Sequence, residues 1–306
     1  MQDSRYHQEL PTDEAVIGWN DQTIKDFHEQ DWDANDVFIN AFYSRIFYQI
    51  SLCNEYLRET TDAKLDGRGV DGSLRSDVAV FRAEARFLRA LSYYHALDLF
   101  GNVPFVTEED AVGAFFPAQI SRADLYNFIE AELKEIETTL LPARSNEYGR
   151  ADQGAGWMLL AKLYLNAEVY TGSPAYTEAA EYSEKVIQAG YKLEEEFGHL
   201  FMADNDGSEE IIFPVAFDGI NTRTWGGTTF IIHAAVGGNM SPDAFGIDGG
   251  WGGIRTTSAL VNKFPTIGSS AEVVAPSEGN SGTYSLLNVP GAYQGWDPEL
   301  NSTTLA

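Results

Sequence analysis

Apolar side chains recur at helical spacing through most of the first 190 residues. In residues 33–59 they fall on every third or fourth position, which predicts a helix with one apolar stripe. Residues 77–100 carry apolar side chains on two faces, so we expect this helix to lie between neighbouring elements. Gly101 and Pro104 follow it, and both are typical of a helix C-terminus. The pattern predicts a mainly α-helical fold.

Capping signals divide the next part of the chain into further helices. Ser121 begins a capping box with the aspartate three residues later, Asp152 is the predicted cap of the following helix, and Ser173 precedes a proline at the expected first helical position. Alanines line the predicted crossing of helices 155–166 and 176–189, which allows the two backbones to approach closely. This pair is predicted to form an αα-hairpin like a tetratricopeptide unit.

The pattern changes outside these helices. Residues 61–76 are rich in Gly and Asp and predict a loop, and residues 210–217 predict a short edge strand because they contain a proline. Residues 219–253 are dense in glycine and predict a long irregular segment of the kind that carries function. We expect three parts: a helical domain over 1–265, a linker over 266–282, and the start of a β-rich module over 283–306.

Charge and composition exclude several classes of function. The 306 residues include 46 acidic and 20 basic side chains, for a net charge of −26, which disfavours binding to nucleic acid or an anionic membrane. Cys53 is the only cysteine, so neither an internal disulfide nor a multi-cysteine zinc site can form. The five histidines lack metal-ligand spacing, and nucleotide-binding and hydrolase motifs are missing. The sequence predicts no cofactor and no metal.

Tryptophans outside the helical stripes are the positive signal. They neighbour Asp, Asn, Gly or Thr, and an exposed indole beside such groups suits a sugar, whose flat face stacks on the ring while its hydroxyls bind polar partners. The alternative for each of them is a tryptophan that pins a loop to the domain.

One segment resembles a known family. Residues 81–107, FRAEARFLRALSYYHALDLFGNVPFVT, are similar to the hallmark helix and turn of the SusD/RagB family. Four further stretches resemble family elements in the same order: 121–141, 149–165 with 176–193, 208–217 and 252–264.

This resemblance implies a right-handed superhelix of tetratricopeptide-like units with the ligand held by irregular insertions. It implies a non-enzymatic lipoprotein on the outer surface of Bacteroidetes-type bacteria, which binds glycans and delivers them to a SusC-type TonB-dependent transporter. The family's lipid-bearing cysteine and first helix are expected upstream, and Cys53 cannot replace that cysteine. By this resemblance we expect the chain to lack the family's usual C-terminal third, since residues 283–306 instead resemble the opening of a SusE/SusF-type starch-binding domain.

The resemblance also suggests site residues. Trp32 and Asn35 match the position of the family's stacking aromatic and its polar partner, just before the helix expected to start at Asp33. The remaining candidates are two indoles for the opposite wall, a further indole near the N-terminus, and polar partners for sugar hydroxyls: Trp225, Trp251, Trp19, Asp31, Asp33, Asn221, Arg223 and Asp248.

Two other functions stay open at this point. A tetratricopeptide-type scaffold would bind a protein or peptide in its helical groove. A glycoside hydrolase would need a pair of carboxylates, and nothing in the sequence selects one pair among 46 acidic residues.

Overall fold

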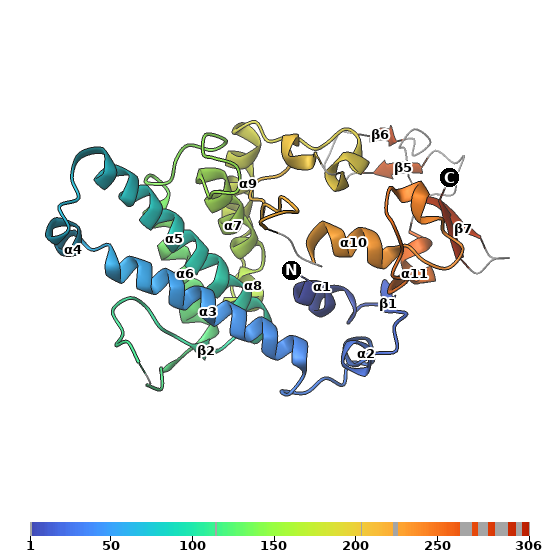
Figure 1. Ribbon diagram of the computed structural model, residues 1–306, viewed down its shortest axis with the longest axis horizontal. Coiled ribbons are helices and arrows are strands. Elements are labelled where there is room, and N and C mark those ends of the chain that lie inside the picture. Colours follow the sequence, from blue (N-terminus) through green and yellow to red (C-terminus); the bar gives the residue numbers. More distant parts are fainter. Residues whose placement is uncertain are drawn as a thin grey trace. The chain divides into compact units, whose positions relative to one another are not determined.

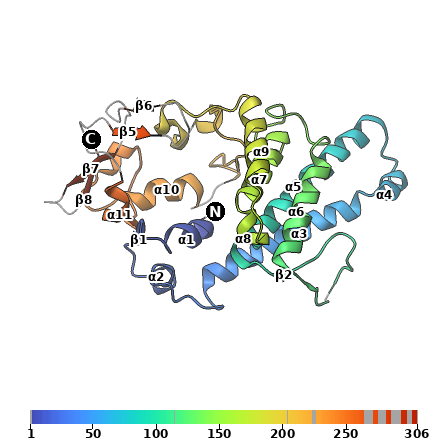
Figure 2. The same cartoon turned by 180° about the vertical axis from the view of Figure 1, so that it is seen from behind.

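A computed structural model describes residues 2–113, 115–202, 204–222 and 226–263, together with four short strands beyond them. The chain forms two compact units (Figures 1 and 2). The first unit contains Met1–Phe42, Glu194–Ser208 and Phe217–Ala306, and the second contains Tyr43–Leu193 and Glu209–Ala216. Helices dominate the second unit, as the sequence predicts.

The second unit is a stack of antiparallel helices. Its helices α5, α6, α7 and α9 lie side by side in both views (Figures 1 and 2). The helices of this part of the chain, including α3, which begins in the first unit, are α3 Val37–Glu59, α4 Asp62–Gly67, α5 Gly72–Phe100, α6 Arg122–Ile136, α7 Gln153–Leu165, α8 Ala167–Thr171 and α9 Tyr176–Gln188.

Two of the predicted helix caps are present and one is misplaced. The Ser121 hydroxyl accepts a hydrogen bond from the Asp124 N–H (3.1 Å), and the Asp152 carboxylate accepts one from the Ala155 N–H (3.1 Å). The prediction of a cap at Ser173 is wrong, because α9 begins only at Tyr176. The αα-hairpin itself is confirmed as the pair α7 and α9, with the short helix α8 in the connection.

A buried ion network joins α5 to α6. Arg89 is 2% exposed, and its guanidinium donates to Glu132 (2.7 Å), to Asn54 (2.8 Å) and to Glu108. Burial alone would lower the pKa of Arg89, but the charges and hydrogen bonds of the two glutamates outweigh it and raise that pKa. The network therefore holds a charged group inside the helical stack.

The first unit is built from short elements around its own core. They are α1 Gln2–Glu9, β1 Ala15–Ile17, α2 Gln22–Glu29, the 3₁₀ turns η1 Phe197–Phe201, η2 Asn205–Gly207 and η3 Pro242–Phe245, α10 Gly227–Ala235, β4 Ile254–Thr256 and α11 Ser258–Val261. Strands β1 and β4 pair antiparallel, with Val16 opposite Arg255. The core contains Tyr6, Phe27 and Phe230.

Three further pairs of short antiparallel strands complete the elements: β2 Val103–Pro104 with β3 Gln119–Ile120, β5 Ala271–Val274 with β6 Ser281–Tyr284, and β7 Tyr293–Asp297 with β8 Ser302–Leu305. Strand β5 lies inside residues 266–282, and the division of the chain into domain, linker and module stays a prediction.

Three other local predictions are wrong. Residues 61–76 contain α4 and the first residues of α5 rather than a loop, and the glycine-rich segment 219–253 contains α10. Residues 210–217, all of which the structure describes, form no strand; Pro214 removes one ladder donor there, and no neighbouring segment pairs with them. Among the described residues no helix is both long and apolar enough to cross a membrane.

Candidate functional site

The turn after α2 positions Trp32. Gln30 adopts the left-handed conformation (φ 58°), which ends the helix. The backbone N–H groups of Gln30 and Asp31 both donate to the Asp26 carbonyl, so the turn is closed and the chain leaves it at a defined angle.

Trp32 is an exposed indole with support beneath it. Its side chain is 43% exposed, and its ring lies 6.0 Å from the ring of Phe27 at an interplanar angle of 29°. Phe27 is 1% exposed and belongs to the core of the first unit. The buried Phe27 ring therefore fixes the orientation of the Trp32 indole, and the exposed part of the indole is accessible to a ligand.

Asn35 follows Trp32 in sequence and lies just before the start of α3. Buried Asp36 caps the helix, because its carboxylate accepts from the N–H groups of Phe38 (2.8 Å) and Ile39 (3.0 Å). The helix thus starts at Val37, whereas the sequence predicted a start at Asp33. The exposed amide side chain of Asn35 makes no hydrogen bond within the part of the chain that the structure describes, so both its donor and its acceptor are available.

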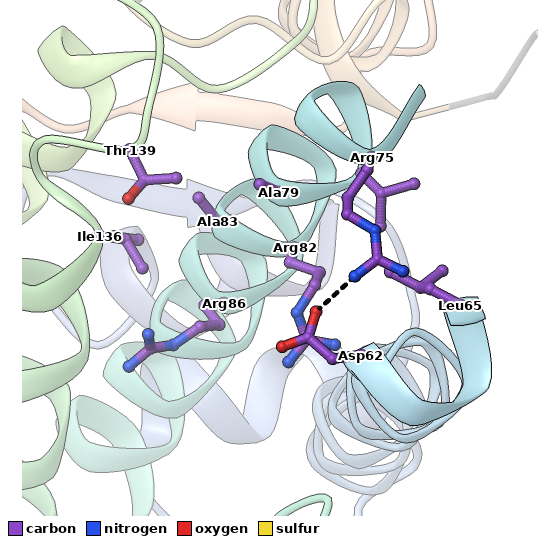
Figure 3. A pocket seen from close by; sticks show the side chains of 10 residues that line it. Asp62, Leu65, Arg75, Ala79, Arg82, Ala83, Arg86, Ile136 and Thr139 are labelled. Atoms are coloured by element: carbon purple, nitrogen blue, oxygen red, sulfur yellow. Dashed lines mark hydrogen bonds and ion pairs between the residues drawn. The ribbon is translucent and has the colours of Figure 1, made fainter. Parts of the chain in front are cut away.

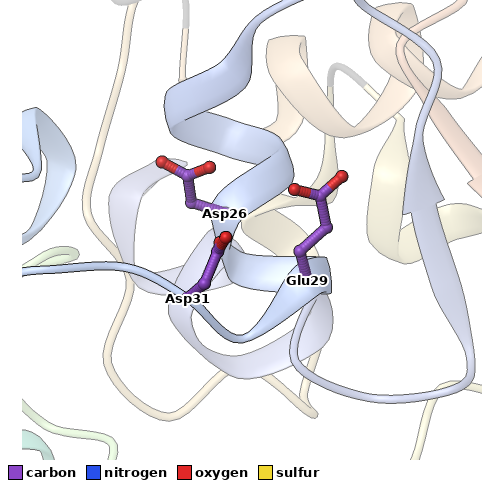
Figure 4. A group of neighbouring side chains, drawn as sticks. All are labelled: Asp26, Glu29 and Asp31. Atoms are coloured by element: carbon purple, nitrogen blue, oxygen red, sulfur yellow. The ribbon is translucent and has the colours of Figure 1, made fainter.

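Carboxylates gather at the C-terminal end of α2. One oxygen from each of Asp26, Glu29 and Asp31 lies within 4.8 Å of the others (Figure 4). The Gln22 amide donates to Asp26 (2.7 Å) and to Glu29 (3.0 Å), which partly satisfies the group. The surface beside Trp32 is therefore anionic and rich in hydrogen-bond acceptors. We call Trp32, Asn35, Asp31 and Asp33 the Trp32 shelf; both of its aspartates are exposed.

Trp19 and Trp251 are less exposed than Trp32, and their role in glycan binding stays a prediction. The two rings are half-buried and pack against the core of the first unit. The Trp19 N–H donates to the Trp251 carbonyl (2.8 Å), and a side chain at Gly253 would overlap the Trp19 ring. These indoles pin the glycine-rich segment to the core, which was the alternative for each tryptophan.

His233 contacts both Trp251 and Asp248. The His233 ring lies 5.0 Å from the Trp251 ring, and His233 Nε2 is 3.6 Å from a carboxylate oxygen of Asp248, whose side chain is 97% exposed. The sequence prediction missed His233 as the residue between them. Its position on α10 was hidden because the glycine-rich composition predicted no helix there.

Asn221 belongs to a closed turn. Its amide donates to Asp218 (2.9 Å), and the other oxygen of Asp218 accepts from three backbone N–H groups, those of residues 220–222. These hydrogen bonds, the one from Thr222 foremost, hold the pKa of Asp218 well below its usual range. The Asn221 amide is thus used within its own loop, while Arg223 and Trp225 lie outside the described residues.

Sequence reasoning also missed Phe27. Its signal was available, because Ile24 and Phe27 form the apolar stripe of an eight-residue helix, and the cap Asp21 precedes that helix. The composition of residues 1–30 is mixed and polar, which concealed this short pattern.

Comparisons with known proteins agree on one family. Residues 2–165 match the model of a SusD-like family described as starch-binding and associating with the outer membrane. The starch-binding protein SusD of Bacteroides thetaiotaomicron is 38% identical over 261 residues, which are 84% of this chain and 45% of that protein.

Solved structures show the same fold. A SusD superfamily protein from Parabacteroides distasonis has a TM-score of 0.69 at 25% identity, with 85% of this chain and 53% of that one covered. A laminarin-binding SusD-like protein has a TM-score of 0.68 at 24% identity, with 85% and 58% covered. The chain spans about half the length of these relatives. By its sequence and its fold, the chain belongs to the SusD-like family.

Proposed function

We propose that this chain is the glycan-capturing part of a SusD-type protein at the outer surface of the outer membrane. The observation that carries the proposal is the Trp32 shelf: a braced, exposed indole followed by an amide without an intramolecular partner among the described residues. An indole face stacks on a pyranose ring, and amide and carboxylate groups bind its hydroxyls.

The shelf suits capture followed by release. Stacking on one exposed indole contributes on the order of 1 kcal/mol, and a few hydrogen bonds add a similar amount each. The sum of about 4 kcal/mol corresponds to roughly millimolar affinity, which lets a bound sugar leave again. We propose that the recipient is a SusC-type TonB-dependent transporter and that the protein itself is not an enzyme.

Neutral glucans are the first ligands to test. The curated relative is a starch-binding protein and a structural relative binds laminarin, and both names point to uncharged polysaccharides. The anionic surroundings of Trp32 also favour an uncharged sugar over an acidic one.

The test is affinity gel electrophoresis on starch, laminarin and other neutral polysaccharides. We expect Trp32→Ala to lose about tenfold in affinity, the equivalent of about 1.4 kcal/mol, while its far-UV circular dichroism stays unchanged. Tyr48→Ala is the matched control, because Tyr48 is a 67% exposed aromatic residue on α3 outside the shelf.

Unchanged retention of Trp32→Ala would contradict the site. Release of reducing ends from any polysaccharide of the panel would contradict the non-enzymatic function. Capture of a peptide without any glycan binding would favour the scaffold instead.

A further inference from the structure

A pocket of about 240 Å³ lies in the second unit, between α4, one face of α5 and the end of α6 (Figure 3). Three arginines line it from α5: Arg75, Arg82 and Arg86. They are spaced by seven and four residues, so they share one face of the helix. We call this the α5 pocket. Three guanidinium groups in one small pocket stand out in a chain that carries only 20 basic residues against 46 acidic ones.

Two of the three guanidinium groups have carboxylate partners. Arg75 pairs with Asp62 (3.3 Å) and Asp66, whose side chains are 91% and 72% exposed, and ion pairs this exposed to water are weak. Arg86 pairs with buried Glu132 (2.7 Å) and with Glu135 on α6. The buried pair with Glu132 therefore holds Arg86 at the pocket, whereas Arg75 is held only weakly.

Arg82 differs from its two neighbours. Within the described residues no carboxylate oxygen lies within 4.0 Å of its guanidinium nitrogens. Its Nη1 donates to the Leu57 carbonyl and to the Thr60 hydroxyl, both at 2.7 Å, at the C-terminal end of α3. Its Nε and Nη2 have no hydrogen-bond partner in the same part of the chain. This half-buried cation therefore has donors free for an anion.

The other walls of the pocket suit a sugar ring. Asp62 and Thr139 offer an acceptor and a hydroxyl, and buried Leu65 and Ile136 supply apolar surface. A volume of about 240 Å³ is space for one small ligand or one sugar residue. The carboxylate of Asp62 favours a singly charged ligand over a dianion such as phosphate.

We propose that the α5 pocket binds a single sugar acid of the hexuronate type. Its carboxylate binds the free donors of Arg82, its hydroxyls bind Asp62 and Thr139, and one face of its ring lies against Leu65. This is a second site with a ligand class of its own, since the Trp32 shelf is proposed for neutral glycans.

The test is a calorimetric titration of the whole chain with D-glucuronate at low salt. D-glucose and acetate are the comparison ligands. We expect millimolar binding of glucuronate, at least tenfold weaker binding of glucose and acetate, and loss of the signal in Arg82→Gln. Because Arg82 also supports the end of α3, a second variant fills the pocket from an exposed position. Ala79 lines the pocket, so Ala79→Leu places a larger side chain in it. Ser76→Leu is the control, because it places the same side chain on α5 outside the pocket.

The outcomes separate the two proposed sites. Binding of glucuronate that is lost in Ala79→Leu, kept in Ser76→Leu and kept in Trp32→Ala supports the α5 pocket. Binding that persists in Ala79→Leu, or that disappears in Trp32→Ala, overturns it. Equal affinity for acetate overturns the sugar acid as the ligand. None of these results changes the expectation for neutral glycans at the Trp32 shelf.

Discussion

Replacing Arg89 tests whether the buried ion network holds the helical stack together. Arg89→Met keeps a long unbranched side chain but removes every donor. Asn54 and Glu108 then lose their guanidinium partner, while Glu132 keeps Arg86. Asn54 is buried, and an unsatisfied buried polar group costs about 1–3 kcal/mol, whereas half-buried Glu108 can bind water and loses less. Breaking a buried ion pair from one side typically costs 3–5 kcal/mol, and we therefore expect a loss of about 4 kcal/mol.

The assay is urea unfolding at pH 7 followed by far-UV circular dichroism. Lys134→Met is the matched control, because Lys134 forms an i,i+4 pair with Glu130 on the surface of α6. Such a pair contributes about 0.3–0.5 kcal/mol, so this variant should stay within about 1 kcal/mol of the parent chain. If Arg89→Met loses no more stability than Lys134→Met, the network is not a source of stability and the reasoning is refuted.

Two further predictions concern the packing of the first unit and the acid sensitivity of the second. Gly253→Ala should destabilise the first unit by about 1–3 kcal/mol, because a Cβ at residue 253 overlaps the Trp19 ring. Gly249→Ala is the control and should be neutral, since nothing lies within 4 Å of its Cβ position. Urea unfolding monitored by tryptophan fluorescence compares the stability of the two variants. Burial raises the pKa of Glu108, but the hydrogen bond from Arg89 outweighs it and lowers that pKa. The stability that Glu108 contributes is then full above the ordinary glutamate value of about 4.3 and is lost as the pH falls through the lower folded-state value. The urea midpoint should drop between pH 5 and pH 3, and a drop of the same size in Arg89→Met would contradict this origin.

The helical frame could be predicted from the sequence because its signals are local. The apolar stripes of α5 and α6, the cap at Ser121 and the stop at Gly101 each depend on residues within a few positions of one another. The motif of residues 81–107 also contains Arg89, but the sequence does not show that Glu132, 43 positions later, receives its charge.

The candidate site could be predicted only in part, because exposure depends on distant partners. Trp32 and Trp251 both neighbour glycine or acidic residues, yet Phe27 leaves the first indole exposed while Phe230 and His233 cover the second. The hydrogen bond from Trp19 to the carbonyl of Trp251 spans 232 positions. A single sequence contains no local pattern for such a contact.

The charges around the two proposed sites lead to opposite ligand preferences. At the C-terminal end of α2, directly before the Trp32 shelf in sequence, the carboxylates of Asp26, Glu29 and Asp31 lie together. A sugar carboxylate at roughly 5 Å from each would meet a repulsion of about 0.8 kcal/mol per pair even at the dielectric constant of water. Three such terms amount to about 2.5 kcal/mol, close to a hundredfold preference for neutral sugars at low salt. At the α5 pocket the charge of Arg82 acts in the opposite direction. Raising the salt concentration should therefore weaken glucuronate binding at the pocket and leave neutral glycan binding at the shelf almost unchanged.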